Sequence, residues 1–201
     1  MIDCFALLAE PRRPWLETEA LKGKFFALSA TAHPDKVQAD GEAARAAAAK
    51  SFAELNGAYR CLAEPKSRLL HLLELELGAK PADIQQIPAG LADLFAEVST
   101  ACRAADGFLA EKGKVTSPLL LVQWFERSQE WIDRLNALQQ KLNGLHGQLM
   151  ERLKAADEEW MRAQGGEQKK LLPKIEELYR LFGYFNRWNK QIQERLVQLM
   201  I

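Results

Sequence analysis

Apolar side chains recur at helical spacing along nearly the whole chain, and this pattern constrains the fold more than any other feature. In the last segment they alternate steps of four and three residues, the spacing of a helix face that packs against other helices. This seam consists of Leu171, Ile175, Leu178, Phe182, Phe185, Asn189, Ile192, Leu196 and Leu199, with Asn189 as its polar position. No sustained apolar–polar alternation bounded by turn residues occurs, so the sequence predicts an all-α fold.

Proline and glycine divide this pattern into seven helical segments. We expect them at about residues 3–8, 18–32, 43–63, 65–77, 91–112, 118–163 and 168–200. The last three are joined by short connections, which predicts an antiparallel three-helix bundle. The boundary with the N-terminal helices falls near Gly78 to Pro81. We therefore expect an N-terminal domain at 1–78, a linker at 79–90 and a C-terminal domain at 91–201.

Composition removes several classes of function. Lys plus Arg and Asp plus Glu both number 27, and no basic stripe is interleaved with aromatic residues, so nucleic-acid and anionic-membrane binding are not expected. The three cysteines, Cys4, Cys61 and Cys102, are far apart and form no CxxC pair, which is typical of free thiols in a reducing compartment.

Helical patterning begins at Ile2, so we expect no signal peptide. The longest apolar run is six residues, Cys4 to Ala9, too short to span a bilayer. We expect a soluble, cytoplasmic protein.

Neither catalysis nor metal binding is predicted by the residue pattern. His71 and His146 have no Cys, His or paired carboxylate at ligand spacing, so we expect no metal and no cofactor. No nucleophile, base and orienting group come together in the sequence, so an enzyme is the least expected class.

His33-Pro34-Asp35 interrupts the helical pattern abruptly. Proline fixes its own φ and disfavours the α region for the residue before it, so the preceding helix is expected to end near Ala32. The tripeptide is then displayed at the tip of a helix–loop–helix hairpin. Taken alone it is equally consistent with a capped proline turn, in which Asp35 caps the next helix and His33 packs locally.

The tripeptide has a wider context. Residues 3–78 resemble a J-domain, the module that activates DnaK-type heat-shock chaperones, from the short first helix at Asp3 through His33-Pro34-Asp35-Lys36 to Gly78. The block Asn56-Gly-Ala-Tyr-Arg-Cys-Leu-Ala-Glu-Pro-Lys-Ser-Arg68, which runs into a leucine-rich helix, is similar to the HscB branch of that family. HscB proteins have about this length and carry a C-terminal three-helix domain after the J-domain. Over residues 84–201 the resemblance is in architecture alone.

The resemblance implies that Asp35 pairs with an arginine of the chaperone, that Pro34 positions this carboxylate and that His33 supports the loop. An arginine–carboxylate pair is directional and charge-assisted, which suits this role. A basic face on the second helix normally assists docking, but here Ala30, Thr31 and Ala32 replace its usual residues. Lys22, Lys24 and Lys36 remain as candidate chaperone-binding cations. Weak electrostatic steering is expected.

In HscB proteins the C-terminal domain binds the scaffold on which iron–sulfur clusters are assembled. The resemblance implies a contact face on the helix after the linker, and the apolar candidates there are Leu91, Leu94, Phe95 and Val98. The acidic residues that the family places next are mostly absent, because the chain continues Ser99-Thr-Ala-Cys-Arg103. An equally weighted alternative is that these apolar residues are the core face of their helix.

Three functions therefore remain. The first is a co-chaperone that stimulates a DnaK- or HscA-type ATPase and delivers an iron–sulfur scaffold. The second is a J-domain protein with a different client, and the third is a helical oligomerisation protein with a degenerate J-domain. If the apolar seams close on each other, the chain is a monomer.

Overall fold

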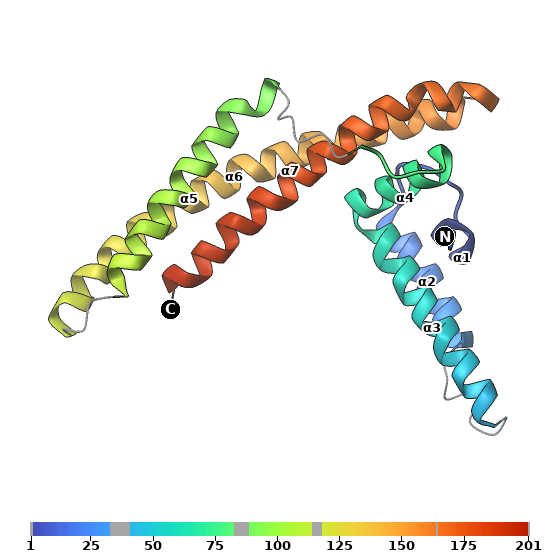
Figure 1. Ribbon diagram of the computed structural model, residues 1–201, viewed down its shortest axis with the longest axis horizontal. Coiled ribbons are helices and arrows are strands. Elements are labelled where there is room, and N and C mark those ends of the chain that lie inside the picture. Colours follow the sequence, from blue (N-terminus) through green and yellow to red (C-terminus); the bar gives the residue numbers. More distant parts are fainter. Residues whose placement is uncertain (1, 33–40, 83–88, 114–117, 164, 201) are drawn as a thin grey trace. The chain divides into compact units, whose positions relative to one another are not determined.

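Helices make up all the regular structure in residues 2–32, 41–82, 89–113, 118–163 and 165–200, which are the residues described by the computed structural model (Figure 1). The α-helices are α1 (Cys4–Leu7), α2 (Thr18–Ala32), α3 (Glu42–Ala63), α4 (Pro65–Leu77), α5 (Ala92–Lys112), α6 (Pro118–Arg162) and α7 (Gln168–Met200). Two 3-10 turns, η2 (Ala89–Leu91) and η3 (Gly165–Glu167), precede α5 and α7. The predicted all-α fold is confirmed, and each helix begins and ends within one residue of its expected bounds.

Local signals account for several of these boundaries. Pro65 and Pro118 are the first residues of α4 and α6, a position where a missing N–H costs nothing. The Glu64 side chain caps α4 by accepting a hydrogen bond from the backbone N–H of Ser67. Gly78 ends α4 with a φ of 72°, a left-handed conformation that favours glycine, and its N–H donates to the Glu74 carbonyl.

The chain forms two compact units that share the two longest helices. One unit contains residues 1–82 and 150–182, and the other contains residues 83–149 and 183–201. The end of α6 and the start of α7 thus pack with the N-terminal helices. At about 1.5 Å per residue, the 45-residue α6 is long enough to serve both units. The domain boundaries at 78 and 91, as limits of independently folding parts, remain a prediction.

The first unit has a core built around the short helix α1. The Asp3 carboxylate caps α1 by accepting from the N–H groups of Phe5 and Ala6, at 3.0 and 3.2 Å. Phe5 and Leu8 are fully buried. Burying a side chain of this size contributes about 1.5–3 kcal/mol, so two such residues hold a helix that is too short to be stable alone. Other fully buried residues of this unit are Leu62, Leu69, Leu72, Leu73, Leu153, Ile175 and Leu178.

The second unit is the three-helix part of the fold, with α5, α6 and α7 side by side (Figure 1). Its buried residues come from all three helices and include Val98, Ala105, Leu135, Leu142, Ile192 and Leu196. One polar layer crosses the α6–α7 seam: the Gln139 amide donates to the Asn189 side chain, and Gln193 donates to the Gln139 oxygen at 2.8 Å. Asn189, the polar position of the predicted seam, thus has an interhelical partner.

The long helices of this fold carry charged side chains along their length. On α6 these include Glu126, Arg127 and Asp133. Across the described ranges, no helix combines the length and the hydropathy needed to cross a membrane.

Candidate functional site

The α2–α3 hairpin leads directly into the predicted trigger tripeptide. Helix α2 ends at Ala32, the residue before His33, and α3 begins at Glu42. His33, Pro34, Asp35 and Lys36 lie outside the described residues. Where the chain enters α3, Gly41 has a φ of 93°, which glycine adopts without strain. Helix α2 thus reaches Ala32, and both the helix end expected from Pro34 and the roles of the tripeptide remain predictions.

Aromatic stacking joins the two arms of the hairpin. The Phe25 ring lies 4.4 Å from the Tyr59 ring, centroid to centroid, and the two planes are 16° apart. Leu21 on α2 and Leu55 and Ala58 on α3 are buried beside them. Stacked pairs of this kind contribute about 0.5–1.5 kcal/mol beyond their buried area, so they help to align the arms.

The two described lysines predicted to bind the chaperone have different surroundings. The Lys24 ammonium lies 2.8 Å from a Glu10 carboxylate oxygen and donates to the Ala9 carbonyl at 3.0 Å. It therefore braces the turn after α1, where Ala9 has a φ of 50°. The Lys22 ammonium lies 3.8 Å from Glu19 on the same exposed helix face. Positive charge available for steering is thus lower than the number of lysines suggests.

An exposed aromatic side chain lies on α2 close to these lysines. Phe26 is 57% exposed, although its neighbour Phe25 is stacked in the hairpin. Contiguous apolar patches at a surface mark contact sites, whereas single exposed apolar side chains are common. Phe26 is not predicted from the sequence as a contact residue, because an aromatic next to a core aromatic is typical of packing.

Residues of α6 hold the loop between α1 and α2. The Asp157 carboxylate accepts from Arg13 Nε at 2.9 Å and from the backbone N–H of Trp15 at 3.0 Å. Trp160 donates its indole N–H to the Arg12 carbonyl, also at 3.0 Å. Hydrogen bonds to a buried charged group are stronger than neutral ones. This loop is therefore fixed at several points.

Arg68 braces the same loop from the α4 side. It is buried, and its guanidinium donates to the carbonyls of Pro14, at 2.7 Å, and Leu62. Burial lowers the pKa of Arg68 to about 10, although the carboxylates of Glu64 and Asp157 act in the opposite direction. This arginine belongs to the block that resembles HscB, and its observed contacts are structural.

The four predicted client-binding residues on α5 and η2 divide into two pairs. Leu91 and Val98 are buried and face the core of the bundle. Leu94 is half-buried, and Phe95 is 40% exposed with its ring 6.2 Å from that of Trp188. The core alternative therefore describes Leu91 and Val98, and the accessible part of the predicted face is Leu94 and Phe95.

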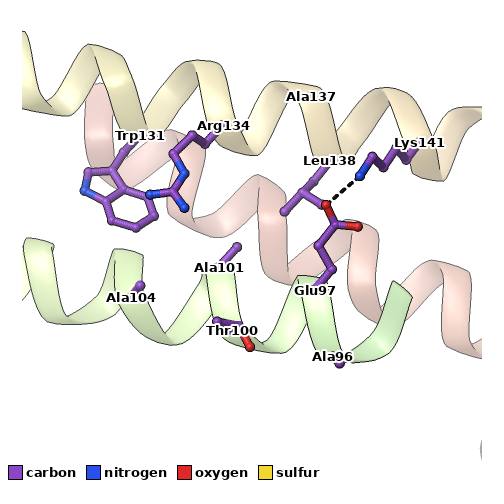
Figure 2. A pocket seen from close by; sticks show the side chains of 10 residues that line it. All are labelled: Ala96, Glu97, Thr100, Ala101, Ala104, Trp131, Arg134, Ala137, Leu138 and Lys141. Carbon is purple, nitrogen blue, oxygen red and sulfur yellow. Dashed lines mark hydrogen bonds and ion pairs between the residues drawn. The ribbon is translucent and has the colours of Figure 1, made fainter. Parts of the chain in front are cut away.

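A groove lies between α5 and α6, and its lining does not include Leu94 or Phe95 (Figure 2). It has a volume of about 590 Å³ and a lining in which alanines of both helices are prominent. At one end the Arg134 guanidinium lies 4.6 Å from the centre of the Trp131 ring, and at the other Glu97 pairs with Lys141 (Figure 2). The arrangement suits a partner with an apolar segment flanked by polar groups.

Comparison with known proteins identifies the family. No family model matches the chain. A co-chaperone protein HscB homolog from Cupriavidus taiwanensis is 31% identical over 179 residues, which make up 85% of this chain and 86% of that protein. The chain belongs to the HscB family of co-chaperones.

Two solved HscB structures have the same fold. HscB from Vibrio cholerae matches with a TM-score of 0.64 and 18% identity, covering 98% of this chain and 99% of that one. Human HscB matches with a TM-score of 0.61 and 17% identity, over 96% of this chain and 81% of that one. The fold is thus an N-terminal J-domain followed by a helical bundle. In this HscB-family chain the hairpin is the J-domain hairpin, and the groove lies in the bundle.

Two further features of this HscB-family chain were not predicted from its sequence. Asp157 lies on the apolar side of α6 near Leu153 and Trp160. A single carboxylate among apolar residues indicates that the fold supplies a partner for it, and this was the signal available in the sequence. The alanines of the groove, such as Ala101 and Ala104, carry no signal by themselves. Helical alanines are common for reasons of propensity alone.

Proposed function

We propose that the chain is a co-chaperone that stimulates ATP hydrolysis by a DnaK- or HscA-type chaperone through His33, Pro34 and Asp35. The proposal rests chiefly on one observation: this tripeptide directly follows α2 of a J-domain hairpin in an HscB-family chain. ATP would be hydrolysed on the chaperone, and this chain would break no bond.

The proposed mechanism is a shift between states of the chaperone. Asp35 would pair with an arginine of the nucleotide-binding lobe in the hydrolysis-competent state and pair poorly in the other. Only such differential binding displaces a conformational equilibrium. Pro34 restricts the backbone beside this carboxylate and reduces the freedom that it loses on binding.

Docking along α2 would depend on apolar contact more than on charge. Lys24 is engaged with Glu10 and Ala9, and Lys22 lies near Glu19. Phe26 offers exposed apolar area on the same helix. We therefore propose Phe26 as a contact residue that complements Lys22 and Lys36, so that association depends only weakly on salt.

We further propose that the bundle binds an iron–sulfur cluster assembly scaffold. Leu94 and Phe95 would form one contact surface, with Phe95 as the apolar anchor, and the α5–α6 groove would form a second. A different client is the second candidate. It is favoured by the stretch Ser99-Thr-Ala-Cys-Arg103 on α5, where the family resemblance implies acidic residues.

The ATPase proposal is tested with the full chain and the DnaK- or HscA-type chaperone from the same organism. Steady-state hydrolysis is measured with wild type, Asp35→Asn and Asp40→Asn. We expect stimulation by wild type and by Asp40→Asn, the control carboxylate of the same segment, and a return to the basal rate with Asp35→Asn. Equal stimulation by all three proteins would refute the trigger role of Asp35.

The client proposal is tested by calorimetric titration of the full chain with the scaffold from that organism. Wild-type binding that Leu94→Ser/Phe95→Ser abolishes would support this surface. Ser substitution at Leu77, which is exposed on α4, serves as the control for a lost surface hydrophobe. Absence of wild-type binding, together with intact ATPase stimulation, would favour a different client. Absence of both activities would favour the oligomerisation alternative.

A further inference from the structure

Three metal-ligating side chains from three helices meet in the J-domain. They are Cys4 at the start of α1, Cys61 in the last turn of α3 and His71 in α4, and one ligand atom of each lies within 4.8 Å of the others. We propose that Cys4, Cys61 and His71 bind a zinc ion. No metal is expected from the sequence because ligand spacing along the chain does not show distant positions that the fold brings together.

The donor set selects the class of ion. Two cysteine sulfurs and one imidazole nitrogen are soft to borderline ligands, which favour zinc over the hard, oxygen-preferring ions magnesium and calcium. Zinc is four-coordinate in nearly all structural sites, so one position remains to be filled.

A hollow beside the cluster accommodates that fourth ligand. It has a volume of about 340 Å³ and is lined by Arg60, Cys61, Ser67, Leu70, His71 and Glu74. A water molecule can enter from this side. Glu74 lines the hollow but does not belong to the group of ligand atoms within 4.8 Å of one another, so water is the expected fourth ligand.

The protonation states of the cluster suit a cation. Burial lowers the pKa of His71 below its usual value, which favours the neutral imidazole that metals require. The Cys61 thiol donates to the Ser67 carbonyl at 3.8 Å, and its closeness to Cys4 lowers the pKa of Cys4 while raising that of Cys61. Zinc displaces the protons of both thiols when it binds the two sulfurs. Two thiol protons are released, and the two thiolates neutralise the double charge of the ion.

Zinc binding exchanges one existing contact for metal ligation. The backbone N–H of Cys4 now donates to His71 Nε2 at 3.0 Å. A neutral imidazole has one nitrogen lone pair, so ligation through either ring nitrogen ends this hydrogen bond. Cys4 is half-buried in the first turn of α1, where water can replace the lost acceptor. The Cys4 amide is therefore a direct reporter of binding.

Zinc titration of the tag-free, reduced and chelator-stripped full chain tests the site. A chromophoric chelator competes for the metal, and Cys4→Ser and Cys61→Ser are compared with wild type. Cys102→Ser is the matched control, because this buried thiol lies on α5 in the other unit. We expect one zinc per chain, and a loss of affinity of at least about a hundredfold in the first two variants, since even outer-shell changes cost 10–100-fold.

Two further readouts separate ligation from misfolding of the variants. Added zinc should protect two of the three wild-type thiols from alkylation, and it should shift the amide resonance of Cys4. Cobalt in place of zinc should give thiolate charge-transfer absorption. Absence of zinc uptake, uptake that survives both Cys4→Ser and Cys61→Ser, or no protection of wild-type thiols would overturn the proposal.

Discussion

Arg13 and Asp157 lie 144 positions apart in the chain and form a two-point ion pair, in which Nε and Nη2 of the guanidinium each approach a different carboxylate oxygen. The Asp157 side chain is 4% exposed and that of Arg13 is 29% exposed. The pKa of Arg13 is raised, chiefly by its hydrogen bond to Asp157. This pair fastens the α1–α2 loop of the J-domain to the end of α6 within one compact unit.

We expect Asp157→Asn to lower the free energy of unfolding by about 2–3 kcal/mol. The change removes the partner of a half-buried guanidinium, and the loss falls somewhat below that of a fully buried pair because Arg13 keeps some contact with water. Urea unfolding followed by circular dichroism measures this loss. Glu158→Gln, which removes an exposed pair with Arg162, is the control and should cost less than about 0.5 kcal/mol. Equal losses would contradict the bracing role of Asp157.

Lys22 and Lys24 should differ in what they contribute to the stability of the folded chain. Lys24→Gln should destabilise the chain by about 1 kcal/mol, because it loses the contacts with Glu10 and the Ala9 carbonyl. Lys22→Gln should leave stability within about 0.5 kcal/mol of wild type. Thermal unfolding of the two variants checks this ordering. A larger loss in Lys22→Gln would show that the Lys24 contacts contribute little.

The groove prediction is tested by filling it. Ala104→Trp places a large ring among the lining residues and should weaken binding of a client that uses the groove by at least about tenfold, the factor that corresponds to 1.4 kcal/mol. Ala110→Trp, at an exposed position of α5 outside the groove lining, is the matched control. Titration with the iron–sulfur scaffold compares them. If both variants bind like wild type, the client contacts another surface.

Asn189 offers a test of how the seam sets the state of association. We predict a monomer, because α6 and α7 bury their apolar faces within the chain. Asn189→Leu should raise the free energy of unfolding by about 1 kcal/mol, since a polar residue in such a seam lowers stability while fixing register. Urea unfolding and sedimentation equilibrium check both statements. An obligate wild-type dimer that dissociates on substitution of Leu149 or Phe185 would contradict the monomer.

Helix periodicity and breakers were enough to predict the helices. Gly78 and Pro118 act on their own backbones, so their effect on helix ends can be read locally. The HscB-like block up to Arg68 was likewise sufficient to indicate the family. Asp157 could not be interpreted in this way, because a buried carboxylate has meaning only when its distant partner is known.

The candidate sites also differ in how far the sequence alone could locate them. His33, Pro34 and Asp35 are contiguous, so their position after α2 follows from the sequence. The client face depends on which side of α5 is covered, and the fold turns Leu91 and Val98 inward while leaving Phe95 exposed. Periodicity identifies an apolar stripe on a helix. It does not show how much of that stripe a neighbouring helix buries.

The sequence by itself determined the all-α class, the helix boundaries and the family, because these depend on interactions between residues a few positions apart and on contiguous motifs. The tertiary structure decided that Arg13 meets Asp157, that alanines of α5 and α6 line a groove and that Cys4, Cys61 and His71 converge. Each of these depends on contacts between residues far apart in the chain, and packing of whole helices sets those contacts.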